Sequence, residues 1–244
     1  MQVEFVGLPG CGKSTLASAL EKRLVAEGYR AQGLRNAAKA AIAASQDKIG
    51  FLRRRGERIS LYGCFVFAHK NPELFEWMFR MSHKDFVALS WGMEALSQIG
   101  ILQEHGDPEL IVFNDEGFLQ RLSWNFMGLE DGPEVTEISA LLPDDFITIH
   151  LTLPQDLAYS RIQDRKKGIP SGLKAKTDAE TLVKLAQYGT MLDRFVEARR
   201  ARGCPVYKVD TKQDIGVIVD EVIAHLRPFL PAAKPARQKR KAKL

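Results

Sequence analysis

The sequence has few cysteines and no long apolar segment. Its 244 residues contain three cysteines, Cys11, Cys64 and Cys204, at spacings that fit no metal site. A small, odd number of cysteines argues against a disulfide-stabilised secreted domain. No apolar run approaches the ~20 residues that a membrane-spanning helix requires. We therefore expect reduced thiols and no membrane partner.

A targeting segment is also missing from the beginning of the sequence as given. Residues 3–6, VEFV, already have the pattern of a short strand. This leaves no room for a signal peptide or an arginine-rich transit peptide. The expected location is the cytoplasm.

Acidic residues are absent from residues 231–244, which also lack aromatic residues and apolar periodicity. The six basic residues of this segment are Lys234, Arg237, Lys239, Arg240, Lys241 and Lys243. They account for the formal net charge of +5, so the rest of the chain is close to neutral. Such a segment cannot bury enough surface to offset its ordering entropy, and we expect a disordered basic tail. It either attracts nucleic acid or another polyanion, or solubilises the chain without a partner.

A glycine-rich motif near the start is the most informative feature of the sequence. Residues 7–14, GLPGCGKS, match the G-x-x-x-x-G-K-[ST] pattern of a phosphate-binding P-loop. An apolar run precedes the motif, and leucines at helical spacing follow it. In a strand–loop–helix context, backbone N–H groups and the helix N-terminus bind phosphates. Lys13 then reaches the β- and γ-phosphates, and Ser14 ligates Mg²⁺. The alternative is an ordinary glycine-rich turn. The predicted nucleotide contacts are Gly7, Pro9, Gly10, Cys11, Gly12, Lys13, Ser14 and Thr15.

The remaining periodicities predict strands that alternate with helices. Further strands are expected at residues 29–34, 110–113, 146–151 and 206–209. Residues 36–105 have a helical pattern with breaks near Gly50, Gly56 and the Asn71-Pro72 pair. Later helices are expected at 118–126, at 138–142, from Pro154 as the first helical residue, from a capping box at Thr177, and at 215–226. This alternation predicts one parallel sheet covered on both faces.

With its P-loop and this alternation, the chain over residues 1–228 resembles P-loop kinases of the nucleoside and nucleoside-monophosphate kinase group. Thymidylate kinases and deoxynucleoside kinases are the nearest in layout. The resemblance implies an α/β fold, the three-layer sandwich of P-loop NTPases, with a five-stranded parallel sheet in the order 2-3-1-4-5. It also implies ATP, Mg²⁺ and a small-molecule phosphate acceptor. We expect one domain at 1–230, with a helical acceptor-binding insertion at 36–109 and a lid loop at 164–177.

The resemblance gives roles to the acidic pair Asp115-Glu116 after the third strand. Asp115 is expected to help bind Mg²⁺, and Glu116 to polarise the acceptor. A carboxylate at a buried strand end that faces the phosphate loop suits metal binding. The alternative is that Asp115 caps the following helix. The group often places an arginine beside the pair, but Gly117 stands there and the nearest arginine is Arg121, which we expect to bind substrate.

Further cations correspond to phosphate-binding positions of the group. Arg35 follows the second strand, where thymidylate kinases hold the acceptor's phosphate within a T-R-E-P-G signature. Here the sequence reads G-L-R-N, so a solvated surface arginine remains the alternative. The second strand also ends without the acidic residue that serves many small-molecule P-loop kinases as a base. Arg161 and Arg165 resemble lid arginines that neutralise the transferring phosphoryl group, the alternative being a solvated helix face. Thr211 follows the fifth strand, where relatives contact adenine.

These features predict an ATP-dependent kinase that phosphorylates a nucleoside or a nucleoside monophosphate. A small GTPase would need the guanine-binding N-K-x-D segment, which the sequence lacks. Two alternatives stay open. One is a P-loop regulatory module that acts on nucleic acid through its basic tail. The other is a kinase of a sugar, an antibiotic or a polynucleotide end, because the fold does not determine the acceptor. A homodimer is compatible with the sequence.

Overall fold

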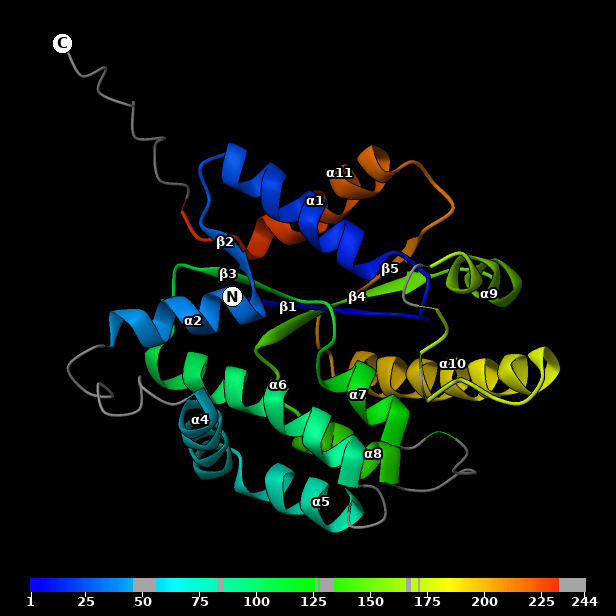
Figure 1. The fold of residues 1–244 in the computed structure, drawn as a ribbon. Coiled ribbons are helices and arrows are strands. Elements are labelled where there is room, and N and C mark those ends of the chain that lie inside the picture. The colour runs from blue at the N-terminus through cyan, green and yellow to red at the C-terminus, as the bar shows by residue number, and fades with distance from the viewer. Residues whose placement is uncertain are drawn as a thin grey trace.

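The computed structural model describes residues 1–45, 56–82, 86–125, 127, 134–165, 168–170 and 172–232. A five-stranded parallel sheet runs through the centre of the molecule (Figure 1). Its strands are β1 (Gln2–Val6), β2 (Ala31–Gly33), β3 (Ile111–Asn114), β4 (Phe146–Thr152) and β5 (Val206–Asp210). Their order is β2-β3-β1-β4-β5, which confirms the predicted order.

The central strand β1 pairs with β3 on one side and with β4 on the other. Val3 lies opposite Phe113 of β3 and Ile147 of β4. Parallel pairing in this register brings the carboxyl ends of β1 and β3 to one edge of the sheet. The residues after these two strands therefore meet in space although they are far apart in the sequence.

Helices cover both faces of the sheet and complete a three-layer sandwich (Figure 1). One face is covered by α1 (Lys13–Ala26) and α11 (Ile215–Leu226), which is followed by the short η1 (Arg227–Phe229). The helices on the other face are α2 (Leu34–Ala44), α6 (Phe86–His105), α7 (Phe118–Asn125), α8 (Glu134–Leu141) and α10 (Asp178–Ala201). Helix α9 (Gln155–Gln163) follows β4 at the edge where the P-loop lies.

Two hydrophobic cores result, and the alternation of side chains along β1 divides its residues between them. Val3 and Phe5 belong to the core under α1 and α11. Val6 belongs to the core under α2, α6, α7 and α10. Glu4, at the position between Val3 and Phe5, faces the second core and is 2% exposed. A carboxylate at such a position needs a specific partner, which α7 provides.

The insertion between β2 and β3 is helical, as predicted. Beyond α2 it contains α4 (Gly56–Lys70) and α5 (Pro72–Ser82), which pack with α6. Helices α4 and α6 cross with their backbones in contact. A Cβ on Gly63 would overlap the carbonyl oxygen of Ser97, and a Cβ on Gly100 would overlap that of Gly63. Glycine at both positions therefore allows the backbones of α4 and α6 to approach this closely.

Several predicted boundaries are corrected by the structure. Strand β2 is shorter than the predicted 29–34, because Leu34 already begins α2 and Arg35 lies in its first turn. Pro154 is the N-cap of α9 and not its first helical residue. Gly56 begins α4, so it starts a helix where we had expected an interruption within one. The break at Asn71, between α4 and α5, and the capping box of Thr177 with Glu180 are confirmed.

Some predictions fall outside the described residues, namely the break at Gly50, residues 166, 167 and 171 of the predicted lid loop, and most of the basic tail. Within the described part of the chain, no helix is both long enough and apolar enough to cross a bilayer.

Candidate nucleotide and acceptor site

The P-loop joins β1 to α1 and packs directly against α9. Gly10 has φ 87° and Gly12 has φ 95°, in the left-handed region that favours glycine. A Cβ on Gly10 would lie 2.6 Å from the carbonyl oxygen of Ala158 in α9. Glycine at this position thus allows the loop backbone to approach the helix that carries Arg161. The motif predicted from the sequence has the strand–loop–helix context that phosphate binding requires.

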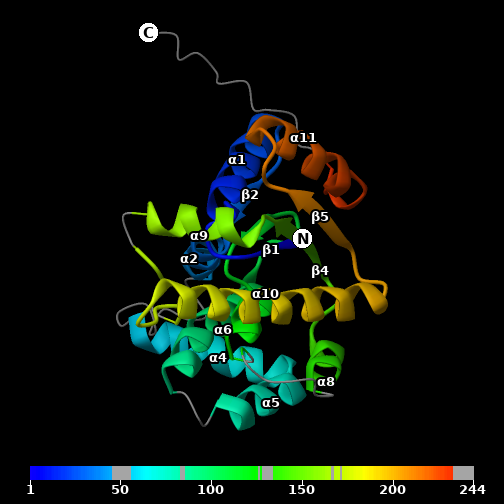
Figure 2. The same cartoon turned by 90° about the vertical axis from the view of Figure 1, so that its right-hand side faces the viewer.

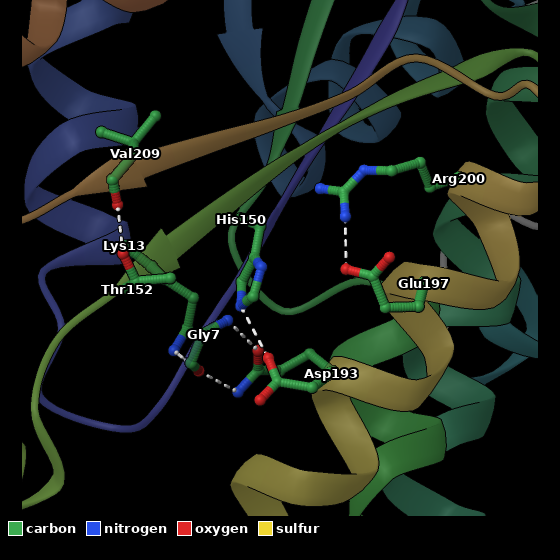
Figure 3. A network of polar contacts seen from close by, with 9 residues as sticks. Gly7, Lys13, His150, Thr152, Asp193, Glu197, Arg200 and Val209 are labelled. Carbon is green, nitrogen blue, oxygen red and sulfur yellow. Dashed lines mark hydrogen bonds and ion pairs between the residues drawn. The ribbon is translucent and has the colours of Figure 1, made fainter.

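Lys13 folds back over the loop. Its Nζ donates hydrogen bonds to the carbonyl oxygens of Gly7 at 2.7 Å and Leu8 at 3.1 Å. Figure 3 shows the Lys13 side chain beside Gly7. Burial lowers the pKa of the Lys13 ammonium, while the nearby Cys11, Glu116 and Asp115 raise it and Arg165 lowers it. Asp115, Glu116 and Arg165 therefore lie close enough to Lys13 for electrostatic interaction, and the structure brings four predicted site residues together.

Ser14 and Asp115 meet although they are distant in sequence. The Ser14 hydroxyl donates a hydrogen bond of 2.5 Å to Asp115 Oδ2. A hydroxyl and a carboxylate oxygen are hard ligands of the kind Mg²⁺ takes together with phosphate oxygens and waters. The described residues contain no group of three or more histidine, cysteine or acidic side chains that could hold a metal by themselves. The pair therefore fits a metal that is held jointly with a nucleotide.

The N-terminus of α7 is capped by Glu4 and not by Asp115. Glu4 Oε1 accepts hydrogen bonds from the backbone N–H groups of Leu119 at 2.7 Å and Gln120 at 3.4 Å. A Cβ on Gly117 would lie 2.6 Å from this same oxygen, so the absence of a side chain makes room for the cap. The capping alternative for Asp115 does not hold, because Asp115 contacts Ser14.

Burial raises the pKa of Glu4 from its ordinary value of 4.5 to about 7, against the lowering effect of Arg199 and the α7 amides. The folded state therefore holds this proton more tightly than the unfolded state. The resulting stabilisation is complete below about pH 4.5 and is lost as the pH rises through about 7. A shift of this size corresponds to up to ~3 kcal/mol of unfolding free energy.

We expect Glu4→Gln to flatten this pH dependence, because its amide oxygen still accepts the Leu119 N–H but the side chain does not titrate. Urea unfolding at several pH values between about 4.5 and 8 measures the effect. Glu21→Gln, on α1, is the matched control and should keep the wild-type slope. An unchanged slope in Glu4→Gln would show that Glu4 does not titrate in this range.

A cleft of about 470 Å³ opens beside Asp115, between the ends of β2 and β3 and helix α6. It is lined by Gly33, Leu34, Arg35, Asn36, Glu94, Ala95, Gln98, Asn114, Asp115, Glu116 and Arg121. All four cleft residues predicted from the sequence (Arg35, Asp115, Glu116 and Arg121) are present. Arg121 donates from Nε to the backbone carbonyl of Glu116 at 3.0 Å and approaches its carboxylate at 3.6 Å.

The lid region lies next to the P-loop. Arg161 and Arg165 are both exposed, at the end of α9 and just after it. In the described part of the predicted lid loop, Leu173 is fully buried, and a Cβ on Gly172 would lie 3.0 Å from the ring of Trp124 in α7. The loop is therefore anchored by apolar contacts that its polar sequence did not suggest. A groove of about 740 Å³ lies further along the chain and is lined by residues within 174–184. Three of its lining residues, at 174–176, belong to the predicted lid loop, but none is a predicted site residue.

Two further residues lie near the phosphate site. The Thr211 hydroxyl and backbone N–H both donate to the carbonyl oxygen of Thr152, each at 3.0 Å. This fixes the loop after β5 to the end of β4, and the predicted adenine contact stays a prediction. His150 lies opposite Val6 in the sheet and contacts Asp193 of α10 at 3.4 Å (Figure 3). Burial lowers the pKa of His150, while Asp193 and Glu197 raise it and Lys208 and Arg200 lower it.

Polar residues of this region that the sequence-based predictions did not include are Glu4, Asn36, Glu94, Gln98, Asn114 and Gln120. Glu4 interrupts an otherwise apolar run, which is a usable signal for a buried, paired carboxylate. Glu94 and Gln98 are one helical turn apart and hydrogen-bonded at 3.3 Å. Their spacing in the sequence is only a weak indication that they share a site. Gln120 belongs to no motif.

The comparisons with known proteins do not assign the chain to a family. No protein-family model matches the chain, and no curated protein matches it. Among solved structures, one that resembles it is described as a deoxyadenosine kinase from M. mycoides with bound dATP. The two chains are 16% identical with a TM-score of 0.46, and the match covers 93% of this chain and 100% of that chain. A likeness at this level says nothing about the ligand of this protein.

Proposed function

We propose that the protein is an ATP-dependent phosphotransferase, which moves the γ-phosphoryl group of ATP to a hydroxyl of a nucleoside or to the phosphate of a nucleoside monophosphate. The position of Asp115 carries the proposal. Its carboxylate accepts a hydrogen bond from Ser14 next to the P-loop, and the same residue lines the cleft of about 470 Å³. A phosphate held by the P-loop and a hydroxyl held in the cleft would meet beside this carboxylate, as direct transfer requires.

In the proposed reaction, the acceptor oxygen forms a bond to the γ-phosphorus while the bond to the ADP oxygen breaks. The hydroxyl proton passes to a carboxylate of the cleft, for which we propose Glu116. Lys13 neutralises the β- and γ-phosphate oxygens, and Arg161 at the end of α9 and Arg165 just after it approach the same charge. Ser14 and Asp115 would hold Mg²⁺, which when bound supplies charge neutralisation between the phosphates.

The lining of the cleft favours an acceptor without a phosphate. Three carboxylates face two guanidinium groups there, those of Glu94, Asp115 and Glu116 against those of Arg35 and Arg121. This balance disfavours a phosphate dianion. The side-chain amides of Asn36, Gln98 and Asn114 offer donors and acceptors to an uncharged polar molecule. Between the two proposed acceptors, a nucleoside therefore fits the cleft better than its monophosphate.

An acceptor screen tests the proposed function. Purified protein with ATP and Mg²⁺ is given nucleosides, nucleoside monophosphates, sugars, antibiotics and polynucleotide ends, while ADP release and phosphorylated products are measured. We expect a phosphorylated nucleoside that is absent with Lys13→Ala. Phosphorylation of a compound from another class would identify a different acceptor for the same activity. ATP binding without any phosphoryl transfer would favour a nucleotide-binding module instead.

The basic tail supports that second candidate, a P-loop module that acts on nucleic acid. We predict that removal of residues 231–244 leaves kcat on a small acceptor within about twofold, because exposed chain ends tolerate truncation. The same truncation should abolish any salt-sensitive RNA or DNA binding, which binding titrations at several salt concentrations measure. A loss of transfer on truncation would place the tail in the catalytic unit.

A further inference from the structure

One buried side-chain amide holds the first glycine of the P-loop. Gln120, in the first turn of α7, is 4% exposed. Its Oε1 accepts a hydrogen bond from the Gly7 N–H at 3.2 Å, and its Nε2 donates to the Gly7 carbonyl oxygen at 3.1 Å. A single planar group thus binds both backbone polar groups of one residue. We call this the Gln120–Gly7 contact.

The conformation of Gly7 needs such an external contact. Its φ is 154°, in the region that favours glycine, and a Cβ would lie 2.5 Å from the carbonyl oxygen of Leu151. Without a side chain, glycine has the widest choice of backbone conformations. The two hydrogen bonds act on the peptide groups on either side of its Cα. Together they restrict rotation about both φ and ψ.

The Gly7 carbonyl is also where the Lys13 ammonium lies, at 2.7 Å. The donors of Gln120 and Lys13 converge on this one oxygen. Any rotation of the Gly7 peptide would therefore move the oxygen away from Lys13, the predicted phosphate-binding cation. The orientation of the peptide and the position of the cation are linked.

Gln120 is itself held from two sides. Its backbone N–H donates to Glu4 Oε1 at 3.4 Å, and its carbonyl oxygen accepts from the buried Tyr188 hydroxyl at 3.1 Å. The Tyr188 ring stacks on Trp124 with a centroid separation of 4.3 Å. These contacts fix α7 against β1 and α10, so the Gln120 side chain extends from a well-supported backbone.

We propose that Gln120 is a positioning residue of the phosphate site, which fixes the peptide groups of Gly7 and through them the resting position of the Lys13 ammonium. The expected effect of Gln120 on ATP binding rests on the proposed nucleotide-dependent activity. Gln120 acts through Gly7 and Lys13. Because the next residue, Arg121, lines the acceptor cleft, α7 contributes to both halves of the site.

The first test compares Gln120→Met with Ser123→Ala. Methionine keeps the length of the side chain without its polar atoms. Ser123 is a buried residue of the same helix whose hydroxyl donates to the Leu119 carbonyl at 2.7 Å, so its removal is the matched control. Amide hydrogen exchange of residues 7–13 is measured without ligand, and the Kd of ATP with Mg²⁺ by calorimetry. Gln120→Met should speed exchange and weaken ATP binding, each about tenfold, whereas Ser123→Ala should do neither.

The pH dependence of ATP affinity in Gln120→Glu distinguishes the positioning role from a merely structural one. A protonated carboxyl accepts from the Gly7 N–H and donates to its carbonyl oxygen, but an ionised one cannot donate. Relative to wild type, the ATP affinity of Gln120→Glu should therefore improve as the pH falls from about 8 to about 5. This variant also serves if Gln120→Met does not fold.

The outcomes separate the inference from the proposed function. Exchange in residues 7–13 that stays at the wild-type rate in Gln120→Met, or a pH-independent affinity ratio for Gln120→Glu, would overturn the positioning role. If the wild-type protein binds no ATP, the proposed function and the role of Gln120 in it are both wrong. If ATP binds but no acceptor is phosphorylated, only the transfer proposal fails and the exchange and affinity comparison stands.

Discussion

Lys13→Ala should abolish phosphoryl transfer while the protein stays folded, with kcat lowered by roughly 10³-fold. In the proposed function, the Lys13 ammonium is the cation that the P-loop would hold against the phosphates. Its hydrogen bonds in the structure go to the loop carbonyls of Gly7 and Leu8 and to the Cys11 Sγ, so its loss removes little from the packed core. Steady-state ADP release with the best acceptor from the screen measures the loss, and circular dichroism confirms the fold.

Lys13→Arg should fail as well, because a planar guanidinium does not fit a pocket shaped around a compact ammonium. Lys22→Ala, which removes an exposed lysine from the same helix, is the matched control and should retain activity. Near wild-type transfer by Lys13→Ala would rule out a catalytic role for the P-loop.

Asp115→Asn and Glu116→Gln should have different kinetic effects, although the residues are adjacent. Asp115→Asn removes the charge of a proposed metal ligand but keeps an acceptor for the Ser14 hydroxyl. The Mg²⁺ concentration needed for half-maximal rate should therefore rise roughly tenfold or more. Glu116→Gln removes the proposed proton acceptor and should lower kcat about 10²-fold with ATP affinity nearly unchanged. Magnesium titrations and full kinetics of each variant separate the two effects.

Glu94→Gln is the comparison for Glu116→Gln, because it removes a carboxylate from the opposite wall of the same cleft. A larger fall of kcat in Glu94→Gln than in Glu116→Gln would indicate that Glu94 of α6 is the proton acceptor. If neither Asp115→Asn nor Glu116→Gln changes the kinetics and only the melting temperature falls, the acidic pair is structural.

The basic architecture could be predicted because its signals are local. The P-loop, the buried strand before it and the leucine spacing after it lie within residues 3–24, and the structure forms β1 and α1 there. The capping box at Thr177 is also a short-range pattern, and it begins α10 as predicted. Boundaries failed where local signals were weak, as at β2, whose three residues leave little periodicity to detect.

The cleft proposed to bind the acceptor was predictable only in part. Arg35, Asp115 and Glu116 follow strands whose carboxyl ends meet at one edge of a parallel sheet, so the sequence placed them together. Glu94 and Gln98 reach the same cleft because α6 packs against α2, whose first turn carries Arg35 and Asn36. Packing between helices decides such an approach, and no short pattern encodes it.

By itself, the sequence determined a P-loop, a parallel α/β sheet and an acidic pair at the end of the third strand, because each depends on neighbouring residues. Only the tertiary structure decided that Glu4 caps α7 and that Gln120 binds Gly7. In the sequence, Leu119 of α7 is 115 positions from Glu4, and Gln120 is 113 positions from Gly7. Hydrogen bonds over such separations form when buried polar groups take the partners that packing brings within reach, and a single sequence carries no periodicity that identifies those partners.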